Sequence, residues 1–260
     1  MSAAETLFHI EPPVAFLTFN RPKARNAMTW GMYQALLSAC EAVDRDETVR
    51  VFVLRGAGGR AFSAGTDIAQ FLEFKETEDS LRYEQRVGEV LDTLAGVVKP
   101  TIAQVEGVAA GAGCGIALTC DLRVATPESS FGIPVARTLG NCVPAGAYCR
   151  LVDLVGPGRA ADILLTGRLV EAAEAQQIGL VNRIAPGDTI GETVCELALE
   201  MAANAPLTVR GIKEMGRRLA RRHLSGADVR DVMQACYTSA DFREGVEAFL
   251  AKRPPRWTGH

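Results

Sequence analysis

A glycine-rich stretch at residues 99–121, KPTIAQVEGVAAGAGCGIALTCD, constrains the fold of this chain more than any other part of its sequence. Residues 101–105 are mostly apolar, Gly107 interrupts the run, and the small residues GAGCG at 111–115 precede the apolar residues 116–118. This order predicts a buried strand, a turn that only backbone can line closely, and a helix. Because the first turn of a helix leaves N–H donors unpaired at the positive end of its dipole, we expect the turn to hold an anion or an oxygen that becomes anionic.

Four interpretations of this turn compete. A Walker-type phosphate loop requires a lysine and a hydroxyl residue after its glycines, and neither is present, so this interpretation is excluded. A dinucleotide-binding turn that starts at Gly111 fails because Ile116 stands where its third glycine belongs. Close packing of a helix on a strand and an oxyanion hole both remain open, and the oxyanion hole requires a second N–H donor from elsewhere in the chain.

The composition limits the partners of the chain. Its 260 residues are 48% hydrophobic, enough for one large core, and its net charge of −3, from 31 acidic and 28 basic residues, favours neither nucleic acid nor an anionic membrane surface. The 7 cysteines show no C-x-x-C spacing and the 3 histidines lie far apart, which argues against a disulfide framework, a zinc site or a histidine-based triad. We recognise no signal peptide and no membrane span, and therefore expect a cytoplasmic protein.

The pattern along the chain alternates strands and helices to about residue 190 and is helical afterwards. We expect strands at residues 6–10, 14–19, 50–55, 101–105, 121–125 and 180–184, and the end of a further strand within residues 61–67. We expect helices at residues 29–44, 76–95, 111–118, 146–155, 157–165, 171–179, 189–204, 206–222, 225–236 and 239–250. Thr29 is the expected N-cap of its helix, and Asp67 with Gln70 and Thr189 with Glu192 match capping boxes. The pattern predicts a mixed α/β core followed by a helical appendage.

Two charged features have an ordinary structural interpretation. At a position such as that of Asp67, a carboxylate is more often a helix cap than a catalytic acid. The one conspicuous basic cluster has helical spacing, which is typical of a solvated face rather than of a phosphate site, although it would also suit an anionic cofactor tail: Arg217, Arg218, Arg221 and Arg222.

Several motifs, in their order and spacing, resemble the crotonase superfamily of enoyl-CoA hydratases and isomerases. They are NRP at 20–22, NA at 26–27, AFSAGTDI at 61–68, KPTIAQVEGVAAGAGCGIALTCDLRVA at 99–125, FGIP at 131–134, LTGRLVEAAEAQQIGLVNRI at 165–184, APL at 205–207 and FREGVEAFLAKRPPRWTG at 242–259. The resemblance covers nearly the whole chain. It implies a spiral of ββα units at 1–195, a helical oligomerisation region at 196–260, and an acyl-coenzyme A thioester as substrate with no tightly bound cofactor.

The resemblance also supplies the second donor. In the family the thioester oxygen lies between two backbone N–H groups, which map to Ala64 and Ala112 of this sequence. An enolate oxygen requires such donors, and the loss of one costs on the order of 100- to 1000-fold in rate. By resemblance, the coenzyme A groove is lined by Arg25 and by residues 62–68, which include Asp67 and Ile68, and no metal is implied.

The chain departs from the family at the two glutamates that hold and activate water in the hydratases. Gly115 and Val135 occupy those positions, so hydration by two carboxylates has lost both of its groups. The loop at 136–144 is one residue longer than the usual family loop. Four polar residues near the expected acyl pocket remain as candidate acids, bases or substrate contacts, with Asn141 first because its amide both donates and accepts: Arg137, Asn141, Cys142 and Tyr148.

Three functions are consistent with these residues. The first is a lyase or isomerase of the crotonase type that acts on an acyl-CoA through its oxyanion hole. The second is an enolate-stabilising enzyme of other chemistry, a decarboxylase or a thioesterase, and the third is a non-catalytic acyl-CoA binder. Apolar faces on the C-terminal helices, together with the resemblance, predict a homotrimer or homohexamer: Val229, Val232, Met233 and Cys236.

Overall fold

The computed structural model describes residues 4–73, 77–138 and 143–220, together with residues 240, 244, 253, 256 and 258–260. Its larger sheet has the strand order β1-β2-β3-β5-β7-β10, in which β1 pairs antiparallel with β2 and the other neighbours are parallel. These strands are β1 (Thr6–Glu11), β2 (Val14–Phe19), β3 (Val51–Gly56), β5 (Thr101–Val105), β7 (Leu122–Ala125) and β10 (Arg183–Ile184). All six were expected from the sequence to within a few residues.

Both faces of the large sheet are buried. Along β2, Ala15, Leu17 and Phe19 belong to the core cluster on one face, whereas Val14 and Phe16 belong to the cluster on the other. Successive side chains of a strand point to opposite faces, so a strand with apolar side chains on both faces needs a cover on both sides. Helices supply the two covers.

A smaller sheet carries the strands that follow β3, β5 and β7. Its order is β4-β6-β8-β9, parallel except for the pair formed by β8 and β9. These strands are β4 (Ala61–Ser63), β6 (Val108–Ala110), β8 (Ser130–Gly132) and β9 (Val170–Glu171). The chain therefore passes three times from the large sheet to the small one, which agrees with the expected spiral of ββα units. Strands β6, β8 and β9 were not predicted, because two or three residues are too short to show an alternating pattern.

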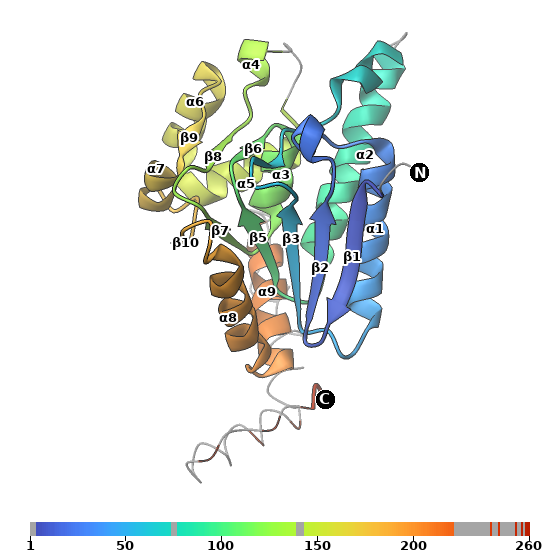
Figure 1. The fold of residues 1–260 in the computed structure, drawn as a ribbon, viewed down its shortest axis with the longest axis vertical. Helices are drawn as coiled ribbons and strands as arrows, with labels where there is room; N and C mark the ends of the chain where they lie inside the picture. The colour runs from blue at the N-terminus through green and yellow to red at the C-terminus, as the bar shows by residue number, and fades with distance from the viewer. Residues whose placement is uncertain are drawn as a thin grey trace.

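The helices cover the sheets as their apolar faces require. They are α1 (Trp30–Arg45), α2 (Thr77–Gly96), α3 (Ala112–Thr119), α4 (Val135–Thr138), α5 (Ala145–Val155), α6 (Pro157–Thr166), α7 (Ala172–Gln177), α8 (Ile190–Ala202) and α9 (Pro206–Ala220), with short 3-10 turns η1 (Pro22–Ala24) and η2 (Ile68–Glu73). Residues of α1, α2, α3 and α5 join the larger core cluster, and residues of α8 join the other. In Figure 1, α1 and α2 lie beside the blue strands β1 and β2, whereas α8 and α9 lie below β7 and β5.

The structure tests the predicted caps of α1 and α8. The Thr29 side chain accepts a hydrogen bond from the Met32 N–H at 3.2 Å and caps α1, as expected. The capping box at Thr189 is wrong, because its hydroxyl donates to the Pro186 carbonyl at 3.3 Å and no side chain caps α8. The expected division at 195/196 falls inside α8, whose residues pack in the core. The helix expected at 225–236 lies outside the described residues, as does the helix expected at 239–250 apart from residues 240 and 244.

The arginine cluster lies partly in α9. Arg217 and Arg218 both donate to the Glu214 carboxylate at 2.6 to 2.7 Å, and Arg217 is the more exposed of the two, while Arg221 and Arg222 lie outside the described residues. Among the described residues, no helix combines the length and hydropathy that a membrane crossing requires.

Candidate functional site

Two backbone segments meet beside the small sheet and line one cavity. The first follows β4 at residues 63–66, and the second joins β6 to α3 at residues 110–112. Gly65, at φ +101°, faces the second segment so closely that a Cβ placed there would lie 3.1 Å from the Ala110 carbonyl oxygen and 3.5 Å from the Ala112 nitrogen. The cavity holds about 190 Å³ and is lined by Ala64, Gly65, Thr66, Ile68, Tyr83, Ala110, Gly111, Ala112, Pro134, Val135 and Thr138.

Ala112 places a backbone donor on this cavity. Gly111 is the N-cap of α3 at φ +53°, a backbone conformation that favours glycine, so Ala112 is the first helical residue. The Gly111 N–H donates to the Gly132 carbonyl, and the Gly115 N–H closes the first helical turn on the Gly111 carbonyl. Within the described part of the chain, no acceptor takes the Ala112 N–H. It is one of the unpaired donors that the sequence predicts at this turn.

The second donor is not Ala64. The Ala64 N–H donates to the Arg25 carbonyl at 3.0 Å, so it is already occupied and the prediction that it forms the hole is wrong in this structure. On either side of Thr66, the Gly65 N–H points to the Ser63 Oγ at 3.3 Å and the Asp67 N–H donates to the Met28 carbonyl at 2.9 Å. The Thr66 N–H has no acceptor among the described residues, and Thr66 lines the cavity. The free pair of donors is therefore Thr66 and Ala112.

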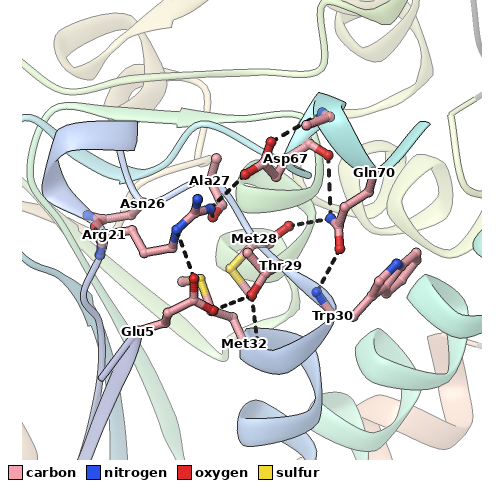
Figure 2. A network of polar contacts seen from close by, with 12 residues as sticks. Glu5, Arg21, Asn26, Ala27, Met28, Thr29, Trp30, Met32, Asp67 and Gln70 are labelled. Atoms are coloured by element: carbon pink, nitrogen blue, oxygen red, sulfur yellow. Dashed lines mark hydrogen bonds and ion pairs between the residues drawn. The ribbon is translucent and has the colours of Figure 1, made fainter. Parts of the chain in front are cut away.

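A polar network surrounds Asp67, the residue that follows Thr66 in the chain, and Figure 2 shows its contacts with Arg21 and Gln70 nearby. The Arg21 Nη1 atom donates to the Asp67 Oδ2 at 2.9 Å and to the Ala27 carbonyl at 2.7 Å, while its Nε lies 3.2 Å from Glu5. The hydrogen bond from Arg21 lowers the pKa of Asp67 below its ordinary 3.8. Asp67 is absent from the described cavity lining, and its carboxylate oxygens accept from Arg21 and from the Ala69 N–H of its own loop.

Gln70 completes this network but does not form the expected capping box. Asp67 Oδ1 accepts from the Ala69 N–H at 3.2 Å, which is the first half of the motif. The Gln70 side chain instead donates to the Met28 carbonyl at 3.0 Å and accepts from the Trp30 N–H at 2.8 Å. The side chain thus ties the 3-10 turn η2 to the start of α1.

The segment at Arg25 is shaped by a buried asparagine. Arg25 and Asn26 have positive φ angles of 50° and 55°, which are uncommon for residues with a Cβ. The Asn26 side chain donates to the Ala57 and Ala61 carbonyls at 3.0 and 2.7 Å and accepts from the Arg21 N–H at 2.9 Å. This anchor presents the Arg25 carbonyl to Ala64. The Arg25 side chain is exposed and is not among the lining residues, whereas Ile68 lines the cavity and is 55% exposed.

The two substituted family positions lie in different surroundings. Val135 lines the cavity, whereas Gly115 is buried against apolar neighbours: a Cβ there would lie 3.6 Å from Leu91 Cδ1 and 3.7 Å from Ala147 Cβ. Tyr148 is 47% exposed and does not line the cavity among the described residues. Asn141 and Cys142 lie outside the described residues, as does the side chain of Arg137.

The sequence analysis missed Tyr83, a residue of α2 that lines the cavity. Its phenol oxygen lies 2.9 Å from the Thr66 Oγ1, which lies 2.7 Å from the Tyr33 hydroxyl of α1. Tyr83 is 8% exposed, and its ring centroid lies 6.0 Å from that of Trp30. A tyrosine on the apolar face of an amphipathic helix predicts only packing, so no local pattern points to this position.

Neither a reactive thiol nor a metal-binding cluster is found at the site among the described residues. Burial raises the pKa of the Cys114 thiol to about 12, so it stays protonated and unreactive near neutral pH. Among the described residues, no group of three histidine, cysteine, aspartate or glutamate side chains is placed to hold a metal ion. The polar groups that the described lining offers are backbone N–H groups and hydroxyls.

This chain is similar in sequence and in structure to known proteins. The sequence model of a family described as enoyl-CoA hydratase/isomerase matches residues 9–260. The 2,3-dehydroadipyl-CoA hydratase of Escherichia coli K12 is 35% identical over 258 residues, 98% of this chain and 99% of that protein. The short-chain-enoyl-CoA hydratase of Clostridium acetobutylicum is 32% identical over 255 residues, 97% of each chain. The crystal structure of an enoyl-CoA hydratase/carnithine racemase from Magnetospirillum magneticum is 32% identical, with 100% of this chain and 97% of that one covered at a TM-score of 0.91.

Proposed function

The chain belongs to the enoyl-CoA hydratase/isomerase family, and we propose that it binds the thioester oxygen of an acyl-CoA between the N–H groups of Thr66 and Ala112. It is an enzyme of the crotonase superfamily that acts on acyl-CoA. One observation carries the proposal. Two backbone donors without acceptors among the described residues line the same cavity, and one of them opens a helix.

These donors suit an oxygen whose charge grows during the reaction. When a proton leaves the α-carbon of a thioester, the electron pair moves onto the carbonyl oxygen, which becomes an enolate oxygen. Fixed N–H dipoles stabilise that oxygen without having to reorient, and one such donor contributes on the order of 100- to 1000-fold in rate. We therefore assign the chain to the lyases or isomerases whose chemistry passes through a thioester enolate.

Hydration by two carboxylates is not part of this proposal. Gly115 and Val135 carry no titratable group, and the surroundings of Gly115 are apolar. An acyl-CoA decarboxylase or thioesterase is the second candidate, since both reactions can use the same oxyanion hole without a pair of glutamates. A non-catalytic acyl-CoA binder would retain the cavity but turn over none of these substrates.

The remaining features of the substrate complex follow from the family. We assign Arg25 and Ile68 to the coenzyme A groove, and Asp67 to the support of that groove through Arg21. Asn141 stays the candidate for a polar contact to the acyl group. No tightly bound cofactor and no metal are needed for enolate chemistry, because backbone dipoles supply the positive charge.

We further propose a homotrimer or homohexamer in the cytoplasm. Large apolar side chains are exposed on helices at the C-terminal end of the described chain, where a partner surface would cover them: Leu199, Ile212 and Leu219. Light scattering at working concentration tests the assembly, and a stable monomer would contradict it.

Turnover and binding with a panel of acyl-CoA thioesters test the function. Saturated, 2-enoyl, 3-enoyl and malonyl-type thioesters are incubated with the protein, and products are identified by mass spectrometry. We expect binding by calorimetry without added metal, and conversion of at least one substrate to an isomer, a hydrated product or a decarboxylated product. Binding without any conversion would leave only the acyl-CoA binder, and absence of binding would refute the assignment of the cavity.

A further inference from the structure

Tyr83 is the one titratable side chain among the described residues that line the cavity. The other described hydroxyls there belong to Thr66 and Thr138, and Thr138 donates to the Pro134 carbonyl at 2.9 Å. Enolate chemistry needs a group that gives or takes a proton at carbon, and Gly115 and Val135 cannot do so. The phenol is therefore the group in this lining whose chemistry matches the need.

The geometry connects the phenol to the oxyanion hole through a single residue. Thr66 carries the proposed backbone donor, and its side-chain hydroxyl lies 2.9 Å from the Tyr83 oxygen. The same hydroxyl lies 2.7 Å from the oxygen of Tyr33. If the Tyr33 hydroxyl donates to Thr66 and Thr66 donates to Tyr83, the two hydrogen bonds reinforce each other and stabilise a negative charge on the Tyr83 oxygen.

We propose that Tyr83 transfers the proton at the α-carbon of the acyl group, with Thr66 and Tyr33 as positioning residues behind it; this inference rests on the proposed function. In one direction the α C–H bond breaks, the proton forms an O–H bond with the Tyr83 phenolate, and the electron pair moves to the thioester oxygen between Thr66 and Ala112. In the other direction the phenol O–H bond breaks, the C–H bond forms from the enolate electron pair, and the phenolate is restored. Exchange of the phenol hydrogen with solvent between the two steps is what brings solvent hydrogen to the carbon.

Deuterium exchange isolates this step from the net reaction. Butyryl-CoA is incubated with the protein in D₂O, and deuterium at the α-carbon is followed by mass spectrometry while calorimetry measures butyryl-CoA binding. Tyr83→Phe removes one oxygen and keeps the ring against Trp30. We expect exchange to fall about 100-fold or more, with little change in affinity or in the thermal unfolding midpoint.

Two further variants separate a proton-transfer role from packing. Thr66→Val keeps the backbone N–H and the side-chain shape but breaks the hydroxyl chain, and Tyr33→Phe removes the hydroxyl that contacts Thr66 from α1. We expect both to lower the exchange rate by less than Tyr83→Phe, and to have little further effect in the Tyr83→Phe background. A purely structural role would change unfolding and leave exchange alone.

The outcomes distinguish this inference from the function on which it rests. If Tyr83→Phe exchanges at the wild-type rate while Ala112→Pro does not exchange, Tyr83 is not the proton-transfer group and the oxyanion hole stands. If the wild-type protein binds butyryl-CoA but exchanges no α-proton, the role of Tyr83 is refuted and binding stands. If the wild-type protein binds no acyl-CoA, both proposals fall.

Discussion

The cavity has a backbone wall, residues 63–66 and 110–112, and a side-chain wall, formed by Tyr83, Val135 and Thr138. The backbone wall is held by contacts that leave no room for change: Gly65 faces the Ala110 carbonyl, and a Cβ on Gly113 would overlap the Ser63 carbonyl. The side-chain wall is apolar where the family has a glutamate after its Phe-Gly-x-Pro motif. One wall is therefore fixed by close backbone contacts, and the other is defined by the identity of its side chains.

Under the proposed function, oxyanion binding and proton transfer therefore depend on different parts of the sequence. Oxyanion binding depends on which N–H groups the fold leaves unpaired, and small residues are sufficient for that. Proton transfer depends on the identity of a few side chains, which can be replaced without moving the backbone. A protein of this family can therefore keep thioester recognition while its acid and base change.

The largest effect is expected on the backbone wall, from Ala112→Pro. Proline removes the N–H that faces the cavity, and Ala112 is the first residue of α3, a helical position that proline tolerates. We expect turnover, and α-proton exchange, to fall about 100- to 1000-fold in a folded protein. Ala112→Gly keeps the donor and is the control. Full turnover by a folded Ala112→Pro variant would remove Ala112 from the hole.

The fate of the two donor predictions shows what sequence can reveal about a backbone site. Ala112 follows a strand and opens a helix, so its unpaired N–H is a local property that the pattern at 99–121 carries. The identity of the second donor depends on which N–H groups of residues 64–67 are already hydrogen-bonded to carbonyls of a distant segment. Here the Ala64 N–H donates to the Arg25 carbonyl. That carbonyl is in position because the Asn26 side chain anchors a turn in which Arg25 and Asn26 both have positive φ. No local pattern predicts that turn, and the sequence analysis assigned the second donor to Ala64 by resemblance alone.

The side-chain wall was harder to predict for a related reason. The sequence shows that Gly115 and Val135 lack carboxylates, which needs no structure. It does not show that Tyr83 faces Thr66, because the two are 17 residues apart, in different elements, and meet only in the folded chain. Likewise, the large sheet followed from long apolar runs, whereas β6, β8 and β9 are too short to stand out. Asn141 lies outside the described residues and stays a prediction.

Introducing carboxylates at positions 135 and 115 tests whether the side-chain wall can support hydration. Val135→Glu places a carboxylate in the cavity lining, whereas Gly115→Glu must extend from a position between Leu91 and Ala147. We expect Val135→Glu to raise crotonyl-CoA hydration more than Gly115→Glu, and the double variant to raise it most, by about 100-fold. Hydration is followed by loss of enoyl absorbance. Fast hydration by the unmodified protein, unaffected by Tyr83→Phe, would mean that another group acts as acid or base.

The substitutions Gly113→Ala and Gly115→Ala in α3 compare how much the free energy of unfolding depends on close packing at each position. A Cβ on Gly113 would overlap the Ser63 backbone behind the oxyanion segment, whereas a Cβ on Gly115 meets Leu91 and Ala147 at ordinary contact distances. We expect Gly113→Ala to lower the free energy of unfolding by about 1–3 kcal/mol through overpacking. Gly115→Ala is the matched control and should be neutral or stabilising, since alanine is the better helix former. Urea denaturation measures both, and equal stability of the two variants would contradict the contact argument.

The smallest effect is expected at the support of the backbone wall, from Asp67→Asn. Asp67 and Arg21 are 26% and 23% exposed, so their ion pair is partly screened, and we expect a loss of about 0.5–1 kcal/mol at pH 7. The pKa of Asp67 is lowered in the folded protein, chiefly by the hydrogen bond from Arg21. The carboxylate therefore stabilises the fold above about pH 4, its ordinary pKa, and this contribution is lost as the pH falls through the lower folded pKa.

The pH dependence separates this pair from an ordinary surface contact. The difference in unfolding free energy between the wild type and Asp67→Asn, measured in urea, should be constant from pH 7 to pH 5 and should shrink as the pH falls below 4. The exposed pair of Glu41 and Arg45 on α1 offers a control, because Glu41→Gln should change little at any of these pH values. If Asp67→Asn behaves like Glu41→Gln, the Arg21 network does not hold the Thr66 segment. The position of that donor would then rest on the Met28 and Arg25 backbone contacts alone.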